Sequence, residues 1–343
     1  MEQEIQEALG DWAKIIKPYK KASNKKATIQ ILNSFLPFIG IWILMYFSLS
    51  WSYWLTIGLA IINSFFLVRI FIIQHDCGHQ SFFALRKWNN RIGWICSLFT
   101  SIPYKYWATV HGYHHGHTGQ LEHRDIGDIN FLTVDEFRNL TGTRKLFYRI
   151  FRNPIILFVL APFIYLAFSN RYPSRGRGFK GWGSAHRSQF INNIALAIFY
   201  FSLIYFLGWK ALVIVHLPIV FFFGITAFWF FYVQHQHEMT YMQWKDKWDY
   251  LLAAIRGATF YNLPRVAHWL TGNIGYHHIH HLSSQIPNYN LRQCANENPI
   301  LQKYVNKLSF VDSLKTINSK LWDERQQRMI SFSEFYELER KRA

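Results

Sequence analysis

Cysteine is scarce in this chain, and its scarcity excludes several kinds of site. Only three cysteines, Cys77, Cys96 and Cys294, occur among 343 residues, and none is paired at the short spacing of a zinc ribbon or an iron–sulfur cluster. Acidic residues are also few, 20 against 37 lysines and arginines, which gives a formal net charge of +17. No glycine-rich dinucleotide fingerprint and no nucleic-acid-binding module occurs. The sequence therefore excludes a disulfide framework and a cysteine-held redox centre, and it predicts no nucleic-acid partner.

Long apolar runs, by contrast, are abundant. Half of the residues are hydrophobic and 19% are aromatic. The hydrocarbon core of a bilayer is about 30 Å thick, so a spanning helix takes about 20 mostly apolar residues. Four stretches reach that length: 28–49, 53–73, 189–207 and 211–233. They predict an all-α integral membrane protein with about four transmembrane helices.

Basic segments suggest how these spans are oriented. Residues 1–26 form a lysine-rich arm without the pattern of a signal peptide, and the positive-inside rule predicts that this arm is cytoplasmic. The basic loop 170–187 is expected on the same side. Two shorter runs, 91–103 and 155–169, are expected in or on the cytoplasmic leaflet, although a six-span arrangement in which both cross is an alternative.

Three regions are thus expected. Residues 1–26 form the cytoplasmic arm, 27–295 the transmembrane domain with its cytoplasmic site, and 296–343 a polar, helical, cytoplasmic C-terminal segment. Arg69 lies inside the second apolar run, where a charge is costly, and is expected to snorkel toward the interface.

Histidine is the most informative residue type. Nine of the sixteen histidines fall in three clusters and one isolated position: His75, His79, His111, His114, His115, His235, His277, His280 and His281. Side chains four apart share a helix face, so each cluster presents a pair of imidazoles, with a third ring at i+3 beside the pair in two of them.

These nine exceed what one ion can bind, so two metals are expected. Imidazole suits zinc, copper, iron and nickel alike. The predicted topology brings all four histidine segments to the cytoplasmic face, which predicts a helical cytoplasmic cap that carries a histidine-rich di-metal site.

The clusters, as written, resemble the histidine boxes of the membrane fatty acid desaturases. HDCGH at 75–79, HGYHH at 111–115 and HHIHH at 277–281 carry the likeness, with VQHQHE at 233–238, LTGNIGYHHIHHLSSQIPNYNL around the third box and KLWDE at 320–324. The resemblance runs from about residue 30 to about residue 330 and is greatest to the bacterial acyl-lipid desaturases.

The resemblance implies two non-haem irons held by the nine histidines, dioxygen as co-substrate, and a membrane lipid acyl chain that acquires a cis double bond. It also implies an external electron donor of the ferredoxin, flavodoxin or cytochrome b5 type. An integral protein of the plasma membrane is expected if the source is bacterial. The chemistry is consistent, because an unactivated methylene has no usable acidity at neutral pH and its oxidation takes a metal-based oxidant.

Groups near the clusters are candidates to orient the rings. The candidates are Asp76, Asp125, Asp128, Glu238 and Asn273, and Asn273 could also reach a metal through a water. The remaining histidines are expected to be structural or surface residues.

Two other functions share these features. A hydroxylase or ketolase on the same scaffold would use the same histidines, because oxygen transfer after the first hydrogen abstraction gives an alcohol. A non-enzymatic metal carrier would instead line a path across the membrane, which histidines gathered on one face do not form.

Overall fold

The four predicted spans are present as long helices. The computed structural model describes residues 1–172 and 182–342. Within these, four helices are long and apolar enough to cross a membrane. They are α3 (Asn24–Ser48), α4 (Tyr53–Gly78), α10 (Trp182–Leu207), and α11 (Leu217–His235), which continues a π-helical turn at Ala211–His216. The predicted all-α membrane architecture is confirmed.

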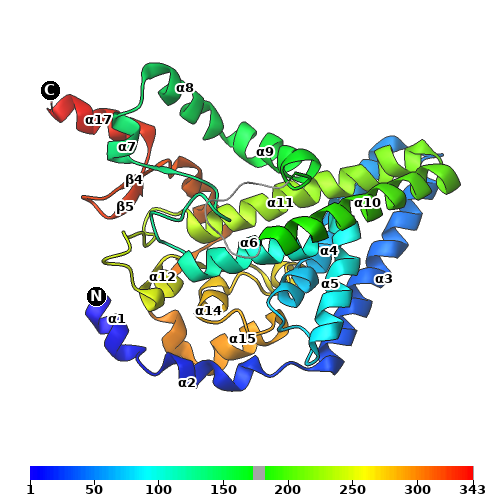
Figure 1. Ribbon diagram of the computed structural model, residues 1–343, viewed down its shortest axis with the longest axis horizontal. Coiled ribbons are helices and arrows are strands. Elements are labelled where there is room, and N and C mark those ends of the chain that lie inside the picture. The colour runs from blue at the N-terminus through cyan, green and yellow to red at the C-terminus, as the bar shows by residue number, and fades with distance from the viewer. Residues whose placement is uncertain (173–181, 343) are drawn as a thin grey trace.

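The spans form two antiparallel hairpins whose turns lie at the same end of the molecule. Ser52 caps the N-terminus of α4 through its hydroxyl, which accepts a hydrogen bond from the Leu55 amide (3.3 Å). Tyr46, at the end of α3, donates to the Leu207 carbonyl (3.2 Å). Figure 1 shows this end opposite both chain termini. The inner ends of α4 and α11 therefore point toward the rest of the fold.

The two shorter apolar runs behave differently from each other. The first lies in α5 (Arg86–Thr100), a 15-residue helix that packs against α4 and is too short to span. The second forms π-helical and α-helical turns, including α9 (Ala161–Ile164), between Ile156 and Ser169. With α8 (Gly142–Phe151) this segment makes a pair bent by 60°, which could be one broken span. Of the two extra crossings that the six-span alternative requires, the structure thus offers a candidate for one, the segment that contains α9.

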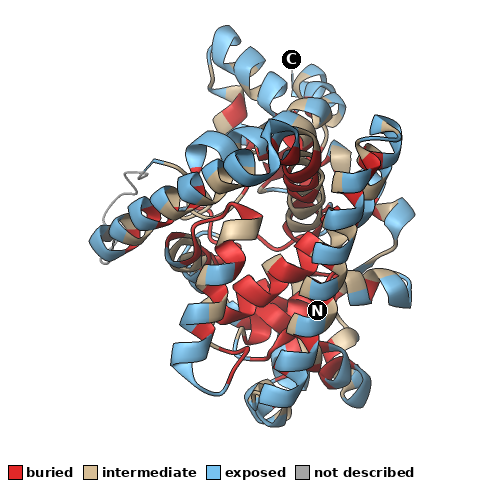
Figure 2. Ribbon diagram, turned by 90° about the vertical axis from the view of Figure 1, so that its right-hand side faces the viewer, coloured by how far each residue is buried: buried red, intermediate tan, exposed pale blue. Residues whose placement is uncertain are grey.

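Shorter helices and strands build a cap over the inner ends of the spans (Figure 1). The cap helices are α1 (Glu2–Ala8), α2 (Trp12–Ile16), α6 (Tyr104–His117), α7 (Val134–Arg138), α12 (Tyr250–Arg256), α13 (Arg265–Leu270), α14 (His277–Leu282), α15 (Asn288–Glu297), α16 (Phe310–Lys315) and α17 (Phe332–Arg342). Single 3₁₀ turns occur at Lys17–Lys20, Pro299–Gln302 and Thr316–Asn318. Figure 2 shows buried residues concentrated inside, with exposed residues on the outer helices.

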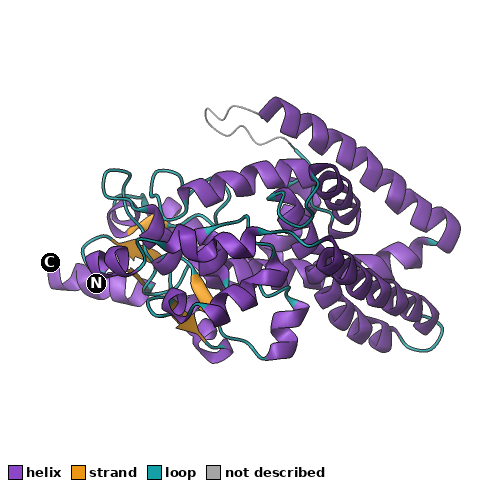
Figure 3. Cartoon of the chain, turned by 90° about the horizontal axis from the view of Figure 1, so that it is seen from below, coloured by secondary structure: helices purple, strands orange, loops and turns teal. Residues whose placement is uncertain are grey.

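Short strands are the main departure from an all-helical cap. In one sheet β1 (Leu132–Thr133) pairs in parallel with β4 (Leu321–Asp323), which pairs antiparallel with β5 (Arg328–Ile330). In the other, β2 (Thr259–Tyr261) pairs in parallel with β3 (Asn306–Leu308). Figure 3 shows these strands at one end of the molecule. The expectation of a helical segment over 296–343 is therefore wrong at β3, β4 and β5. Three-residue strands are too short to show alternation, and β3 and β4 pair with the distant strands β2 and β1.

The basic N-terminal arm is folded onto the cap. The Tyr19 hydroxyl donates to Glu297 (2.5 Å) at the end of α15, and the Asn290 side chain donates to the Tyr19 carbonyl (2.9 Å). The arm and the histidine-bearing helices consequently lie on the same side of the spans. Arg175, Arg177 and Lys180 of the basic loop lie outside the described residues.

Arg69 does not snorkel. Its side chain is buried, its guanidinium lies over the Trp269 ring (3.8 Å to the centroid), and it donates to Asn33 (2.7 Å) and to the Trp269 carbonyl. Because α3 and α13 both supply neutral acceptors beside the span, the charge is satisfied inside the protein. The arginine joins α3, α4 and α13, so the expectation is corrected.

Candidate metal centre

Four elements bring the nine clustered histidines into one buried site. His75 and His79 end α4, His235 ends α11, and the other two clusters lie on α6 and α14. Eight of the nine are buried and His79 is partly buried. The two spans therefore supply three rings at their inner ends, and the two short cap helices supply six.

The rings divide into two groups. In the first, His75, His79, His111, His115 and His280 each offer a ligand nitrogen, and these atoms all lie within 4.8 Å of one another. The second contains His114, His235 and His281 by the same measure. His277 joins this second group, because its Nε2 lies 2.9 Å from Nε2 of His235 and 3.1 Å from Nε2 of His281.

The two groups share helices, and this differs from the sequence expectation. On α6, His111 and His115 serve the first group while His114 faces the second. On α14 the order is reversed, because His277 and His281 serve the second group and His280 the first. The ring at i+3 is thus not beside its i, i+4 pair but in the other group.

The donor atoms fit metal ions. Nε2 of His111 and Nε2 of His115 lie 3.1 Å apart, and Nε2 of His79 and both ring nitrogens of His280 are buried without a hydrogen-bond partner among the described residues. Buried polar atoms without partners are costly unless something binds them. Nitrogens about 2.1 Å from one ion at tetrahedral or octahedral angles lie about 3 Å apart. Each group is therefore suited to a metal that prefers imidazole.

The electrostatics favour the ligating form of the rings. Burial, and then the neighbouring imidazoles, lower the pKa of His111, His115 and His280 well below the ordinary value. The pKa values of His277 and His281 are lowered for the same reasons. A neutral imidazole has a free lone pair, so these rings can ligate at neutral pH.

A carboxylate lies beside one ring in each group. Oδ1 of Asp76 lies 2.9 Å from Nδ1 of His75, and its Oδ2 accepts hydrogen bonds from the amide (2.6 Å) and side chain (2.8 Å) of Asn288. Oδ1 of Asp128 lies 3.0 Å from Nδ1 of His114. Such contacts leave Nε2 as the free ligand atom.

Other predicted groups are placed elsewhere. The Glu238 side chain is 64% exposed and pairs with Arg328 (3.2 Å), so the structure does not bring it to His235. Asn273 has a left-handed backbone (φ 58°) and a long contact to the Asn288 carbonyl (3.5 Å). Asp125 is exposed, and no hydrogen bond between it and a clustered histidine occurs in the described part of the chain.

Sequence reasoning missed two orienting groups. Nδ1 of His235 lies 3.3 Å from the Gly257 carbonyl, and the Thr118 hydroxyl lies 3.3 Å from Nδ1 of His281. A backbone carbonyl carries no sequence signal, and Thr118 was detectable only by its nearness to the second box. The Asn288 contact was missed too, although IPNYNL marked its segment.

The remaining histidines lie outside both groups. The His268 ring lies 5.0 Å from Tyr276 and 6.0 Å from Phe260, two rings that also stack on each other, and Nδ1 of His123 lies 2.7 Å from the Tyr113 hydroxyl. His216 packs against Phe199 and Tyr200. His237 and His278 are buried but belong to neither metal group.

Comparisons with known proteins agree with this geometry. The family model "Fatty acid desaturase" matches residues 49–310. A "Fatty acid desaturase" of Bacillus subtilis (strain 168) is 38% identical over 331 residues, covering 96% of this chain and 93% of that protein. An "sn-1 oleoyl-lipid 12-desaturase" of Synechocystis is 27% identical over 80% of this chain and 75% of that protein. An "Omega-3 fatty acid desaturase, chloroplastic" of Sesamum indicum is 27% identical over 77% of this chain and 56% of that protein. The chain belongs to the fatty acid desaturase family of membrane oxidoreductases.

Proposed function

We propose that this protein is an oxygen-dependent desaturase that introduces a cis double bond into the acyl chain of a membrane lipid. The observation that carries the proposal is the pair of buried, all-imidazole groups at the inner ends of two spanning helices. The Synechocystis relative is named for an oleoyl lipid, which supports a lipid-linked substrate.

The histidines would hold two irons, one in each group. His75, His79, His111, His115 and His280 would hold one, and His114, His235, His277 and His281 the other. When bound, the irons would use dioxygen and two electrons to supply an oxidant strong enough to remove hydrogen from an unactivated methylene. Asp76 and Asp128 would keep the rings of His75 and His114 oriented toward their ions.

The surrounding residues suit a long apolar substrate. Trp107 stacks on His111 (4.4 Å between centroids), and Phe231 lies 5.3 Å from His114. Aromatic side chains beside the rings would exclude water and leave an apolar approach from the spans. The aromatic run 228–232 of α11 leads to His235 at the same end.

Electrons would come from a separate protein, because the three cysteines are buried, free and dispersed. We place the histidine face in the cytoplasm, since the lysine-rich arm lies on that side of the spans. A basic surface would favour an acidic donor of the ferredoxin, flavodoxin or cytochrome b5 type.

Lipid analysis tests the function. The chain is expressed in a host without unsaturated fatty acids, beside His280→Ala and, as a matched control, His123→Ala, which alters a histidine outside both groups. A new monounsaturated acyl chain should form with the unmodified protein and His123→Ala but not with His280→Ala. A hydroxylated or keto chain would instead establish the alternative enzyme, and altered metal uptake without any modified lipid would refute both.

A further inference from the structure

A cavity separate from the histidine groups lies between α13 and α15. Its volume is about 410 Å³, and its walls include Arg265 and Trp269 of α13 and Tyr289 and Arg292 of α15. None of the nine clustered histidines lines it. The volume lies within the range of small-molecule sites.

The cavity carries positive charge that the protein does not neutralise. In the part of the chain that the structure describes, neither Arg265 nor Arg292 has a hydrogen-bond or ion-pair partner. Glu297 is the one acidic side chain in the wall, and its two oxygens already accept from Tyr19 (2.5 Å) and Gln293 (2.9 Å). Two free guanidinium groups over one cavity match the oxygens of a phosphate, which arginine binds in bidentate geometry.

The cavity also lies at the boundary between the spans and the cap. Trp269 packs on Arg69 (3.8 Å) and edge-to-face on Phe66 (6.2 Å), both on α4. Arg69 lies nine residues before the end of α4, so α13 reaches about 14 Å along that span. Val266 of α13 is 69% exposed and Leu36 of α3 is 64% exposed. Apolar side chains beside arginine and tryptophan are typical of the lipid headgroup level.

The segments that line the cavity also support the metal centre. Asn288 opens α15 and donates to Asp76, the carboxylate beside His75. Arg292 follows four residues later, about 6 Å along the helix. A ligand held by Arg292 would therefore be fixed relative to the first histidine group.

We propose that this cavity binds the phosphate of a phospholipid headgroup and so positions the lipid whose acyl chain is desaturated. The inference rests on the proposed function, and it adds the chemistry of the lipid headgroup and the place where the headgroup is held. A phosphate could also come from free phosphate or from a coenzyme A thioester. The exposed apolar side chains of α3 and α13 favour the membrane lipid, because a soluble carrier needs no such surface.

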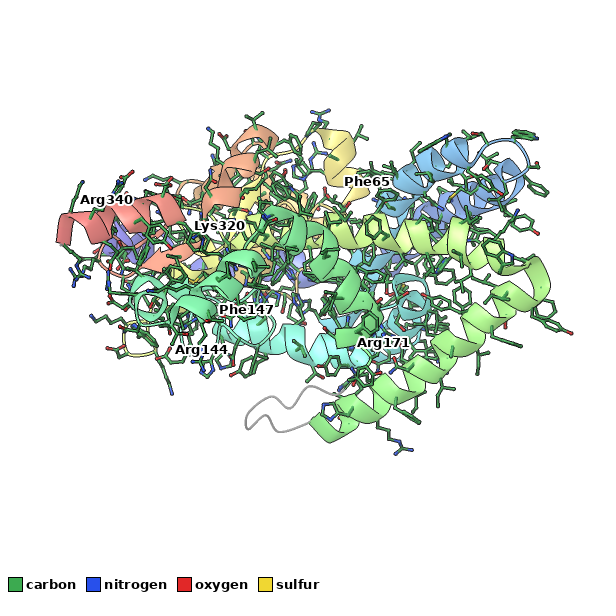
Figure 4. All side chains as sticks on the ribbon, turned by 90° about the horizontal axis from the view of Figure 1, so that it is seen from above. Phe65, Arg144, Phe147, Arg171, Lys320 and Arg340 are labelled. Atoms are coloured by element: carbon green, nitrogen blue, oxygen red, sulfur yellow. The ribbon has the colours of Figure 1, made fainter. Side chains whose placement is uncertain are left out.

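Binding to the purified full-length protein in neutral detergent tests this, with short-chain probes. The probes are dihexanoyl phosphatidylglycerol, dihexanoylglycerol without phosphate, inorganic phosphate, and hexanoyl coenzyme A. The test variant is Arg265→Gln with Arg292→Gln, and the control is Arg325→Gln with Arg340→Gln, which alters two exposed arginines of the cap. Figure 4 shows Arg340 on α17, near the tip of the molecule.

The test variant should bind dihexanoyl phosphatidylglycerol about tenfold or more weakly, as expected for the loss of charge-assisted phosphate contacts. The control should stay within about twofold, the probe without phosphate should bind poorly to every form, and Arg265→Lys with Arg292→Lys should fall between. Unchanged affinity in a variant with an unchanged melting temperature would overturn the inference. So would inorganic phosphate binding as tightly as the lipid, an adventitious ion only, or an effect confined to hexanoyl coenzyme A.

Failure here is distinguishable from failure of the proposed function. Binding is measured without turnover, whereas desaturation is read from the host lipids of the unmodified protein. If that protein forms double bonds but the arginine variant binds phosphatidylglycerol normally, only the headgroup inference fails. If it forms none, the proposed function fails whatever the binding shows.

Discussion

Replacing Asp76 with asparagine should weaken one metal group and spare the other. Asp76 accepts three hydrogen bonds, from His75 and from the amide and side chain of Asn288. The substitution keeps the shape but removes the charge. The new NH₂ group accepts no hydrogen bond, so either His75 or Asn288 loses its acceptor. Loss of an orienting carboxylate costs about 10–100-fold in metal affinity, or about 1.4–2.7 kcal/mol.

The assay measures how much iron each variant retains as the chelator concentration rises. Purified Asp76→Asn, Asp128→Asn and the control Asp125→Asn are reconstituted with ferrous iron and titrated with a chelator, and bound iron is measured by mass spectrometry. In Asp76→Asn and in Asp128→Asn, one iron per chain should be lost at a chelator concentration about 10–100-fold lower than the other iron. The control should match the unmodified protein. Simultaneous loss of both irons, or no change, would refute the assignment of one carboxylate to each group.

Three further outcomes concern stability. Gly93→Ala should lower stability by about 1–3 kcal/mol, because a Cβ there would lie 2.3 Å from the Tyr104 ring. Gly40→Ala is the control and should leave stability unchanged, because a Cβ there meets nothing within 4 Å. Equal melting temperatures for the two variants would contradict the prediction. Burial, and then a neighbouring arginine, lower the pKa of Lys320 to about 8, below its ordinary value of 10.5. Between pH 8 and 10.5 the unfolded chain therefore binds more protons than the folded chain, so the free energy of unfolding should rise with pH in that window by at most about 3 kcal/mol. Denaturation curves of a Lys320→Met variant test this, and a variant that still shows the whole rise would exclude Lys320 as its cause. Arg69→Leu should cost about 2–4 kcal/mol, because the buried Ser34 hydroxyl and the partly buried Asn33 side chain lose their donor. An unchanged melting temperature would mean that the arginine is dispensable.

The predictions that the structure confirms came from local sequence patterns, namely the length of apolar runs and the spacing of histidines. The lengths of the apolar runs predicted the four spans, with ends that differ by up to seven residues, since about 20 apolar residues have few alternatives to a membrane helix. The i, i+4 spacing likewise predicted which imidazoles pair, as in His111 with His115. Asp76 and Asp128, which lie beside or shortly after a histidine box, do contact His75 and His114, and their role in orienting those rings stays a prediction.

Contacts between residues far apart in the sequence could not be predicted from the spacing of residues along the chain. The carbonyl of Gly257 faces His235 across 22 positions of the chain, and Asn288 reaches Asp76 across 212. Arg69 was expected to escape to the interface because its neutral acceptor, the Trp269 carbonyl, lies 200 residues away. Glu238 failed for the opposite reason, since nearness in sequence to His235 does not determine which way a side chain points after a helix ends.

The division of the histidines explains why the second and third boxes each contribute three histidines to the two groups. Successive residues on a helix point about 100° apart, so His114 and His115 cannot face the same ion when both are held by one rigid turn. The spacing H-x-x-H-H therefore directs an i, i+4 pair to one group and the intervening i+3 ring to the other. Because α6 and α14 do this in opposite senses, each group depends on both helices. A displacement of α14 against α6 would disturb both groups at once, because the rings of His115 and His280 (4.5 Å between centroids) meet in the first group and those of His114 and His281 (5.2 Å) meet in the second.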